Sequence, residues 1–263
     1  MARTMPSAAR DPLSGQAALV TGAGKRIGSA VAARIAAAGG DVVVHHHRSA
    51  KEAEVLAGAL RKLGVEAATV EADLADAADR KRLVAAASKA LGKRMTMLVN
   101  NASTFPLCTL AELSLEHLHE AVEVNAWAPF ELTMALAGQV PAGGRGSVVN
   151  FLDARIVDED RRHVGYHLAK RTLADFTRLC ALELAPRVAV NAVAPGPTLP
   201  PPGMGEEEAK RLMARLRRRL PMQRTAEPED LAEAVTYLLS TRVVTGQVLY
   251  VDGGRHLGRQ PGG

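Results

Sequence analysis

AALVTGAGKRIG, residues 17–28, runs from a short apolar stretch directly into a glycine-rich turn. Residues 17–21 are typical of a buried strand, and residues 26–38 have the pattern of a helix. Gly22, Gly24 and Gly28 flank the point where the strand would become the helix. Without side chains there, backbone N–H groups can approach a pyrophosphate at the positive end of the helix. The segment therefore indicates a nucleotide-binding turn.

The rest of the chain repeats this alternation of strand and helix. Strands are expected at residues 17–21, 41–45, 65–71, 97–100, 146–152, 188–194 and 247–251. Helices are expected at residues 26–38, 51–63, 77–91, 115–137, 166–184, 206–219 and 229–239. Such alternation predicts an α/β fold, a Rossmann-type doubly wound parallel sheet of about seven strands with helices on both faces. We expect residues 15–263 to form a single dinucleotide-binding catalytic domain, after a disordered N-terminal tail at residues 1–14.

Composition and charge exclude several classes of protein. The net charge of +5 comes partly from an arginine-rich late helix that is typical of a solvated face, so we expect no nucleic acid partner. No apolar run is long enough to cross a membrane, and residues 1–15 lack the apolar stretch of a secretory signal. Cys108 and Cys180 lie in apolar surroundings without metal-ligand spacing, which predicts buried free thiols and a cytoplasmic location.

Tyr166 and Lys170 lie four residues apart at the start of an expected helix, which places both side chains on one face. A cation beside a phenol favours the phenolate, so we expect Lys170 to lower the pKa of Tyr166. Such a tyrosine is a usable proton donor near neutral pH. Together with the glycine turn, the pair indicates a nucleotide-dependent redox enzyme.

The second expected strand ends in three histidines, which are followed by Arg48 and Ser49. Enzymes specific for NAD tend to place an acidic residue here, to hold the ribose 2′-hydroxyl. A guanidinium and a hydroxyl suit a 2′-phosphate instead, which predicts NADPH as the cofactor, with His47 in the same contact segment. Because consecutive strand residues alternate between faces, His45, His46 and His47 cannot converge on one ion, and no metal is expected.

A proline-rich stretch follows the sixth expected strand, at residues 195–205. Ligands in open α/β sheets bind beyond the carboxyl ends of the strands, so this stretch could border or cover the site. The alternative is a rigid surface connector.

With these features in place, the chain resembles the short-chain dehydrogenase/reductase family over nearly its whole length. The matching motifs occur in the family's order: the glycine turn, Asp73-Leu74, Asn100-Asn101-Ala102-Ser103, Asn125, Tyr166 with Lys170, Pro195-Gly196 and Val251-Asp252-Gly253-Gly254. The resemblance implies that Asn125 holds a water in a proton relay and that Lys170 also binds the nicotinamide ribose. It implies cofactor contacts for Gly22, Gly24, Arg26, Ile27, Asp73, Leu74, Asn101, Ala102, Ser103, Pro195 and Gly196.

Two departures from the family are informative. Arg26 stands where most members have glycine, and Asp153 stands where they have a serine that polarises a substrate carbonyl. An ionised carboxylate cannot do that, but it can accept from an N–H or hold a cationic ring, and a protonated carboxyl can donate. Asp153 therefore suits a nitrogen heterocycle better than a simple ketone. The alternative for Asp153 is a structural cap or a lost catalytic residue.

Lys25-Arg26, His47-Arg48-Ser49, residues 101–105 and Asp153 together resemble the pteridine reductase branch of the family. In that branch the phenylalanine matching Phe105 stacks on the pterin. The arginine matching Arg26 contacts cofactor phosphate or pterin, and the serine matching Ser103 touches the ligand. The alternatives are plain core packing for Phe105 and a surface ion pair for Arg26.

The sequence thus predicts an NADPH-dependent reductase that transfers hydride to a C=N bond of an oxidised pterin, from a dihydropterin to a tetrahydropterin. Tyr166, assisted by Lys170 and Asp153, would supply the proton. Two alternatives stay open: a carbonyl or 3-oxoacyl-thioester reductase of the same family, and a non-catalytic NADP-binding sensor. By resemblance we also expect a homotetramer, packed through residues 115–137 and 166–184.

Overall fold

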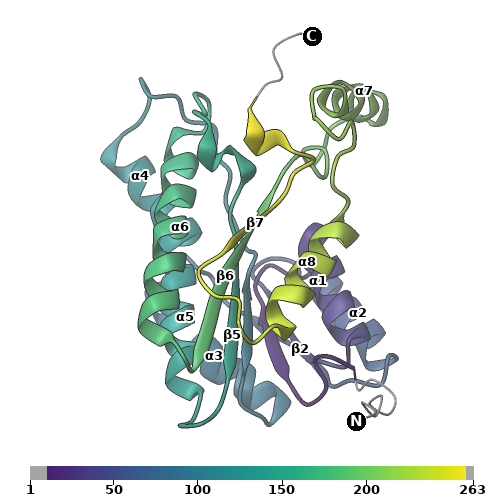
Figure 1. Ribbon diagram of the computed structural model, residues 1–263, viewed down its shortest axis with the longest axis vertical. Coiled ribbons are helices and arrows are strands. Elements are labelled where there is room, and N and C mark those ends of the chain that lie inside the picture. Colours follow the sequence, from purple (N-terminus) through teal and green to yellow (C-terminus); the bar gives the residue numbers. More distant parts are fainter. Residues whose placement is uncertain (1–10, 259–263) are drawn as a thin grey trace, which may run out of the picture.

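One sheet lies between two layers of helices in the computed structural model, which describes residues 11–258 (Figure 1). All seven strands within these residues run parallel, in the order β3-β2-β1-β4-β5-β6-β7. The strands are β1 (Ala17–Val20), β2 (Asp41–His46), β3 (Ala67–Glu71), β4 (Met97–Asn100), β5 (Gly146–Phe151), β6 (Val188–Pro195) and β7 (Val248–Val251). The predicted fold class is therefore confirmed.

Helices cover both faces of the sheet, and apolar side chains fill the space between the sheet and each layer of helices. One face carries α1 (Arg26–Ala37), α2 (Ala50–Arg61) and α8 (Pro228–Ser240) (Figure 1). The other carries α3 (Ala77–Leu91), α5 (Ala128–Gln139) and α6 (Val164–Leu184). Because the sheet is covered on both sides, strands such as β1 and β4 are buried at every residue, which explains their unbroken apolar runs. α7 (Glu206–Arg217) lies apart from both layers (Figure 1).

The long helix expected at residues 115–137 is interrupted. α4 (Leu115–Val122) passes into a π-helical turn, η1 (Glu123–Trp127), before α5 begins. Arg80, buried in α3, holds this turn, because its Nη2 lies 2.8 Å from Glu123 Oε1 and its Nε pairs with Glu131 of α5. Such π-turns are frequent at functional sites, and helix periodicity alone does not distinguish them from an α-helix.

The N-terminal tail expected at residues 1–14 lies outside the described residues for its first ten positions. Of the last four positions, residues 12–14 lie in a turn that ends at residue 15, and Leu13 is 1% exposed in the core that contains Ile35. The backbone N–H of Leu13 donates to the Ala38 carbonyl at 3.0 Å. The predicted boundary is wrong for these four residues, because a single buried apolar side chain anchors an otherwise polar stretch.

The strand order determines where a ligand can bind. The chain reverses its direction of progress across the sheet between β1 and β4, so the segments that follow these two strands meet at the carboxyl edge. Thr21 joins the two segments, because its hydroxyl oxygen accepts from the backbone N–H groups of Asn101 at 2.9 Å and Ala102 at 3.0 Å.

Three further expectations concern single features of the chain. Cys108 and Cys180 are buried free thiols, as predicted. Within residues 11–258 we find no helix with the length and apolar character needed to cross a membrane. The same residues contain no group of three or more His, Cys, Asp or Glu side chains arranged to hold a metal ion.

Candidate active site

Side chains from neighbouring strands hold the glycine turn in place. The backbone N–H of Gly22 donates to His45 Nδ1 at 3.0 Å, and Asn101 Nδ2 donates to the Thr21 carbonyl at 2.9 Å. Gly28 has no room for a side chain, since an added Cβ would lie 2.5 Å from the Gly22 carbonyl oxygen. Asn101, predicted to line the cofactor, therefore also supports the turn.

His45 helps to hold the glycine turn, a role that the sequence analysis did not predict. Because the Gly22 N–H can only donate, Nδ1 of His45 must be the acceptor, and Nε2 carries the proton toward the Ala72 carbonyl at 3.1 Å. Burial lowers the pKa of His45 to about 4, so the ring stays neutral near pH 7 and keeps this acceptor. The pairing of the two strands explains the position of His45. Val20 of β1 pairs with Val44 of β2, so His45, the next residue of β2, lies beside the start of the turn.

A cavity of about 420 Å³ opens at the carboxyl edge of the sheet beside this turn. Its lining includes seven of the residues predicted to contact the cofactor: Gly22, His47, Arg48, Asp73, Leu74, Ala102 and Ser103. The lining combines apolar surface for a planar base with an exposed guanidinium for a phosphate. The cavity therefore fits the adenosine half of a dinucleotide that carries a 2′-phosphate.

Two other residues predicted to contact the cofactor pack behind the turn. Ser49 lies against Gly24, where an added Cβ would be 2.7 Å from Ser49 Oγ. Ile27 is partly buried and packs against the core beneath α1. Their predicted cofactor contacts stay predictions.

Arg26 connects the glycine turn to the proline-rich stretch at residues 195–205. Its backbone lies in the left-handed region, with φ of 57°, and its Nη2 donates to the Pro200 carbonyl at 2.9 Å. At the start of the stretch, Gly196 follows Pro195 and packs so closely on Asp252 that an added Cβ would lie 2.6 Å from its Cα. The Arg26 guanidinium thus has a protein partner, and its contact with phosphate or pterin stays a prediction.

The catalytic candidates Asp153, Tyr166 and Lys170 form one buried cluster beyond the end of β5. The Tyr166 hydroxyl donates to Asp153 Oδ2 at 3.1 Å. Lys170 is 2% exposed, and its Nζ donates to the Phe151 carbonyl at 2.7 Å while lying 5.7 Å from the centre of the Tyr166 ring. The first two turns of α6 therefore bring the predicted pair beside the predicted carboxyl group.

The electrostatics of Tyr166 differ from our expectation. Burial and the negative charge of Asp153 raise the pKa of Tyr166 well above its ordinary value. Lys170 does not reverse this effect, because its ammonium group bonds to the Phe151 carbonyl and burial lowers the pKa of Lys170 to about 8. The predicted lowering of the Tyr166 pKa is therefore wrong for this arrangement, in which the phenol is protonated and donates to a carboxylate.

Arg155 is a second residue that sequence analysis missed. Its backbone N–H donates to Asp153 Oδ1 at 2.8 Å, and its Nη2 lies 2.9 Å from Asp153 Oδ2. Burial raises the pKa of Asp153, but the hydrogen bonds and positive charge of Arg155 lower it by more, so this pKa lies below its ordinary value. Asp153 is thus ionised at neutral pH. A basic residue two positions after the aspartate was the signal in the sequence.

Phe105 lies beside Tyr166, and the ring of a second residue packs on it. It stacks on His163 with ring centres 3.6 Å apart and meets the Tyr166 ring edge-on at 4.6 Å. Its exposure of 48% rules out plain core packing. Stacking of Phe105 on a pterin stays a prediction, and His163 is an aromatic neighbour that the sequence did not reveal.

Asn125 lies in the π-turn and is fully buried. Its Oδ1 accepts from Ser103 Oγ at 2.6 Å and from the Thr104 N–H at 3.1 Å, and its Nδ2 donates to the Ala121 carbonyl at 2.9 Å. The amide therefore fixes the segment at residues 103–104 on the rim of the cavity. The predicted water in a proton relay stays a prediction.

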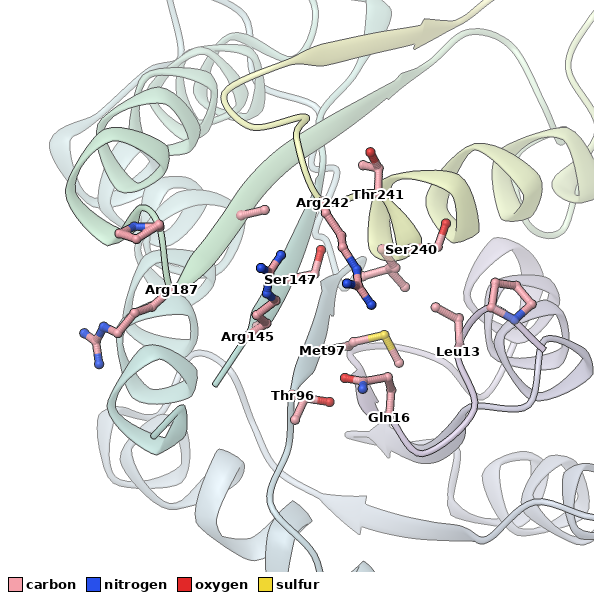
Figure 2. A pocket seen from close by; sticks show the side chains of 15 residues that line it. Leu13, Gln16, Thr96, Met97, Arg145, Ser147, Arg187, Ser240, Thr241 and Arg242 are labelled. Atoms are coloured by element: carbon pink, nitrogen blue, oxygen red, sulfur yellow. The ribbon is translucent and has the colours of Figure 1, made fainter. Parts of the chain in front are cut away.

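A second cavity, of about 130 Å³, lies at the opposite, amino edge of the sheet (Figure 2). Thr96, Met97 and Ser147, at the starts of β4 and β5, contribute to its lining, with Arg145 and Arg242 on its rim. Both arginines are exposed. Because ligands of open α/β sheets bind at the carboxyl edge, the larger cavity is the candidate site.

Comparison with known proteins agrees with this geometry. Residues 22–256 match a family described as "Enoyl-(Acyl carrier protein) reductase". The chain belongs to the short-chain dehydrogenase/reductase family. A Streptomyces violaceoruber protein named "Granaticin polyketide synthase putative ketoacyl reductase 2" is 37% identical over 252 residues, which cover 95% of this chain and 99% of that protein.

Two solved structures are similar over most of the chain. FolM alternative dihydrofolate reductase 1 from Brucella canis, complexed with NADP, is 34% identical with a TM-score of 0.86 and covers 94% of this chain and 96% of its own. The reductase LugOII, described as catalysing keto-reduction in lugdunomycin biosynthesis, is 30% identical with a TM-score of 0.84 and covers 94% of this chain and 100% of its own. This chain is therefore an oxidoreductase of the family.

Proposed function

We propose that this protein is an NADPH-dependent reductase that transfers hydride to a C=N bond of an oxidised pterin, converting a dihydropterin to a tetrahydropterin. The observation that carries the proposal is the 3.1 Å hydrogen bond from Tyr166 to Asp153, where the family has a serine. A carboxylate can accept from the ring N–H and amino groups of a pterin, but it cannot donate to a carbonyl oxygen. The similarity to a FolM alternative dihydrofolate reductase complexed with NADP supports both the cofactor and the substrate class.

The residues at the site have separate parts in this reaction. The nicotinamide supplies hydride to a ring carbon when the cofactor is bound. Tyr166 transfers its hydroxyl proton to the adjacent ring nitrogen, once that nitrogen replaces Asp153 as the acceptor. Lys170 lies near enough to stabilise the phenolate that remains, and Asp153 holds substrate N–H groups in register with Tyr166.

The residues that line the larger cavity are the proposed contacts of the cofactor. Asp73 and Leu74 border the adenine, and the exposed guanidinium of Arg48 receives the 2′-phosphate. Gly22, at the mouth of the turn, leaves room for the pyrophosphate at the amino end of α1. Ser103 and Phe105, between this cavity and Tyr166, are the proposed contacts of the pterin.

Reduction of a carbonyl or a 3-oxoacyl thioester is the second candidate. It is favoured by the relatives named for ketoacyl reduction and keto-reduction. It requires a donor to the carbonyl oxygen at the position of Asp153, which an ionised carboxylate does not provide.

Oxidation of NADPH by the purified protein, followed at 340 nm, tests the proposal with a dihydropterin, dihydrofolate and a panel of ketones. We expect turnover of a dihydropterin and its loss in Tyr166→Phe, while NADPH fluorescence shows that the variant still binds the cofactor. Asp153→Ser should slow pterin turnover but spare or improve ketone turnover. Good turnover of a ketone without turnover of any pterin would refute the substrate class, and NADPH binding without any turnover would favour a sensor.

We also propose that the protein is a homotetramer. Leu168, Leu179 and Leu182 of α6 and Met134 of α5 are exposed apolar side chains, with Leu182 80% exposed. Exposed apolar side chains on neighbouring helices are typical of an interface between subunits. Trp127, 42% exposed between α4 and α5, adds to the same surface.

A further inference from the structure

The largely buried carboxylate of Asp153 needs neighbouring groups that compensate its negative charge. A carboxylate with only 17% of its side chain exposed is costly to ionise unless a cation and hydrogen bonds compensate it. If it were protonated instead, it would not be a fixed acceptor for Tyr166. The compensation must therefore come from groups packed around it.

We propose that Arg155 is a positioning residue for the reaction, which acts as the counter-ion of Asp153 and fixes Asp153 Oδ2 against the Tyr166 hydroxyl. The inference rests on the proposed function in one respect, that Tyr166 is the proton donor. It explains how a carboxylate can replace the family's serine without losing a defined geometry.

Arg155 binds both oxygens of the Asp153 carboxylate. Arg155 Nε lies 3.2 Å from Asp153 Oδ1 and Nη2 lies 2.9 Å from Oδ2, so the guanidinium engages both carboxylate oxygens. The Arg155 backbone N–H adds a third bond, at 2.8 Å to Oδ1. With Nε also 3.3 Å from Oδ2, these bonds from one residue leave the carboxylate little freedom to rotate, and its Oδ2 stays directed at Tyr166.

The far side of the guanidinium is anchored as well. Arg155 Nη1 pairs with Asp160, whose side chain is 9% exposed. Asp160 Oδ1 in turn accepts from the backbone N–H of Arg162 at 2.9 Å. The Arg155 guanidinium also lies 4.8 Å from the centre of the Phe105 ring, which limits its motion on a third side. Arg155 is therefore held in place from three directions.

The charge state of Asp153 depends on all the titratable groups that face the pair. These are Asp160 from the loop before α6, His163 through its stack on Phe105, and Tyr166, His167 and Lys170 from α6. Among the described residues, Arg155 is the cation within ion-pair distance of Asp153, with its Nη2 2.9 Å from Oδ2. Removing its charge should therefore let burial dominate and raise the pKa of Asp153.

A matched control binds the same loop from α6. Arg171 of α6 donates to the Ile156 carbonyl at 3.0 Å and to the Asp158 carbonyl at 2.8 Å. It thus supports the segment that carries Arg155, without a contact to Asp153 among the described residues. A loss of loop structure should affect Arg171→Met and Arg155→Gln alike, whereas a loss of the counter-ion should affect only Arg155→Gln.

The test compares wild type, Arg155→Gln, Arg155→Lys and Arg171→Met in the full-length protein. The first measurement is the pH profile of kcat/KM with whichever substrate is turned over best. In Arg155→Gln the acid limb should move up by about one pH unit or more. At pH 7, where Asp153 stays ionised, kcat/KM should still fall about tenfold, because the carboxylate loses the bonds that hold its orientation. Arg155→Lys, which keeps the charge, should return the acid limb most of the way to its wild-type position, and Arg171→Met should leave the limb unchanged.

The second measurement needs no substrate, so it stays decisive if the proposed pterin reaction fails. Protein labelled with ¹³C at aspartate carboxyls is titrated by NMR, and the Asp153 signal is assigned by its loss in Asp153→Asn. In the wild type it should titrate below the ordinary aspartate range, and in Arg155→Gln above the wild-type midpoint. A wild-type midpoint at or above the ordinary range would overturn the inference even if Arg155→Gln does not fold. Equal shifts in Arg155→Gln and Arg171→Met would overturn it as well.

Discussion

Replacing Lys170 with methionine should remove a pH dependence of stability that the wild-type protein carries between pH 7 and pH 10. The Lys170 side chain is 2% exposed, and its ammonium group donates to a single protein acceptor, the Phe151 carbonyl, among the described residues. Burial lowers the pKa of Lys170 from 10.5 to about 8, although the charge of Asp153 opposes this effect. Methionine fills a similar volume without a charge, so the variant should retain the packing.

The sign and size of the effect follow from proton binding. Between pH 8 and pH 10.5 the unfolded chain holds the Lys170 proton while the folded protein releases it, so folding becomes more favourable as the pH rises. The full difference corresponds to about 3 kcal/mol, and about 2.5 kcal/mol of it falls between pH 7 and pH 10. Below pH 8 the wild type carries the whole cost of the buried charge. The free energy of unfolding of Lys170→Met, relative to that of the wild type, should therefore be highest at pH 7 and lowest at pH 10.

Urea unfolding at pH 7, 8.5 and 10 measures this difference, with Trp127, the single tryptophan, as the fluorescent probe. Protein concentration is kept equal, because self-association would shift apparent stability. Lys81→Met, which removes an exposed lysine from α3, is the control and should show no comparable dependence on pH. If the stability difference between wild type and Lys170→Met stays constant within about 0.5 kcal/mol over this range, the buried-charge argument is refuted.

Three further changes test other parts of the site. His45→Leu removes the acceptor of the Gly22 N–H and should weaken NADPH binding about tenfold, measured by fluorescence titration. Because the pKa of His45 falls from 6.5 to about 4, the wild type should lose stability as the pH drops through that window, and this variant should not. Arg48→Ala should weaken NADPH binding about tenfold and leave NADH binding unchanged, and an equal loss for both would remove Arg48 from the 2′-phosphate. Leu179→Glu with Leu182→Glu should dissociate the oligomer in analytical ultracentrifugation, whereas an unchanged mass would exclude the α6 surface.

The fold was predictable because a sheet buried on both faces requires apolar strands and helices with one apolar side, and both patterns are visible in the sequence. Strands such as β1 and β4 are buried at every residue, so they appear as short apolar runs without alternation. Helices that cover one face show a one-sided periodicity, which located α3 without error. The π-turn at η1 escaped prediction, because one extra residue per turn in an apolar helix changes hydrogen bonds rather than composition. The buried role of Leu13 escaped because one contact, not a pattern, anchors it.

The sequence predicted which side chains meet in the catalytic cluster, but not which neighbouring residues hold them. Motif order along the chain identified Asp153, Tyr166 and Lys170, and the structure brings them together. Their partners depend on tertiary contacts, such as Arg155 on Asp153 and His163 on Phe105. For the same reason the predicted lowering of the Tyr166 pKa was wrong, since the nearest charge to the Tyr166 hydroxyl is a carboxylate.

The charge of Asp153 separates the two reductase chemistries on energetic grounds. Hydride addition to a ketone builds negative charge on oxygen, and at about 4 Å from a carboxylate the repulsion is about 4 kcal/mol at the effective dielectric of a protein surface. Uncompensated, that cost slows the step by about a thousandfold. Tyr166 can protonate the atom that gains the charge in either reaction, but only a pterin also offers neighbouring N–H groups that bond to Asp153 favourably and offset the repulsion. A site that keeps this carboxylate ionised through Arg155 therefore favours a substrate rich in N–H donors.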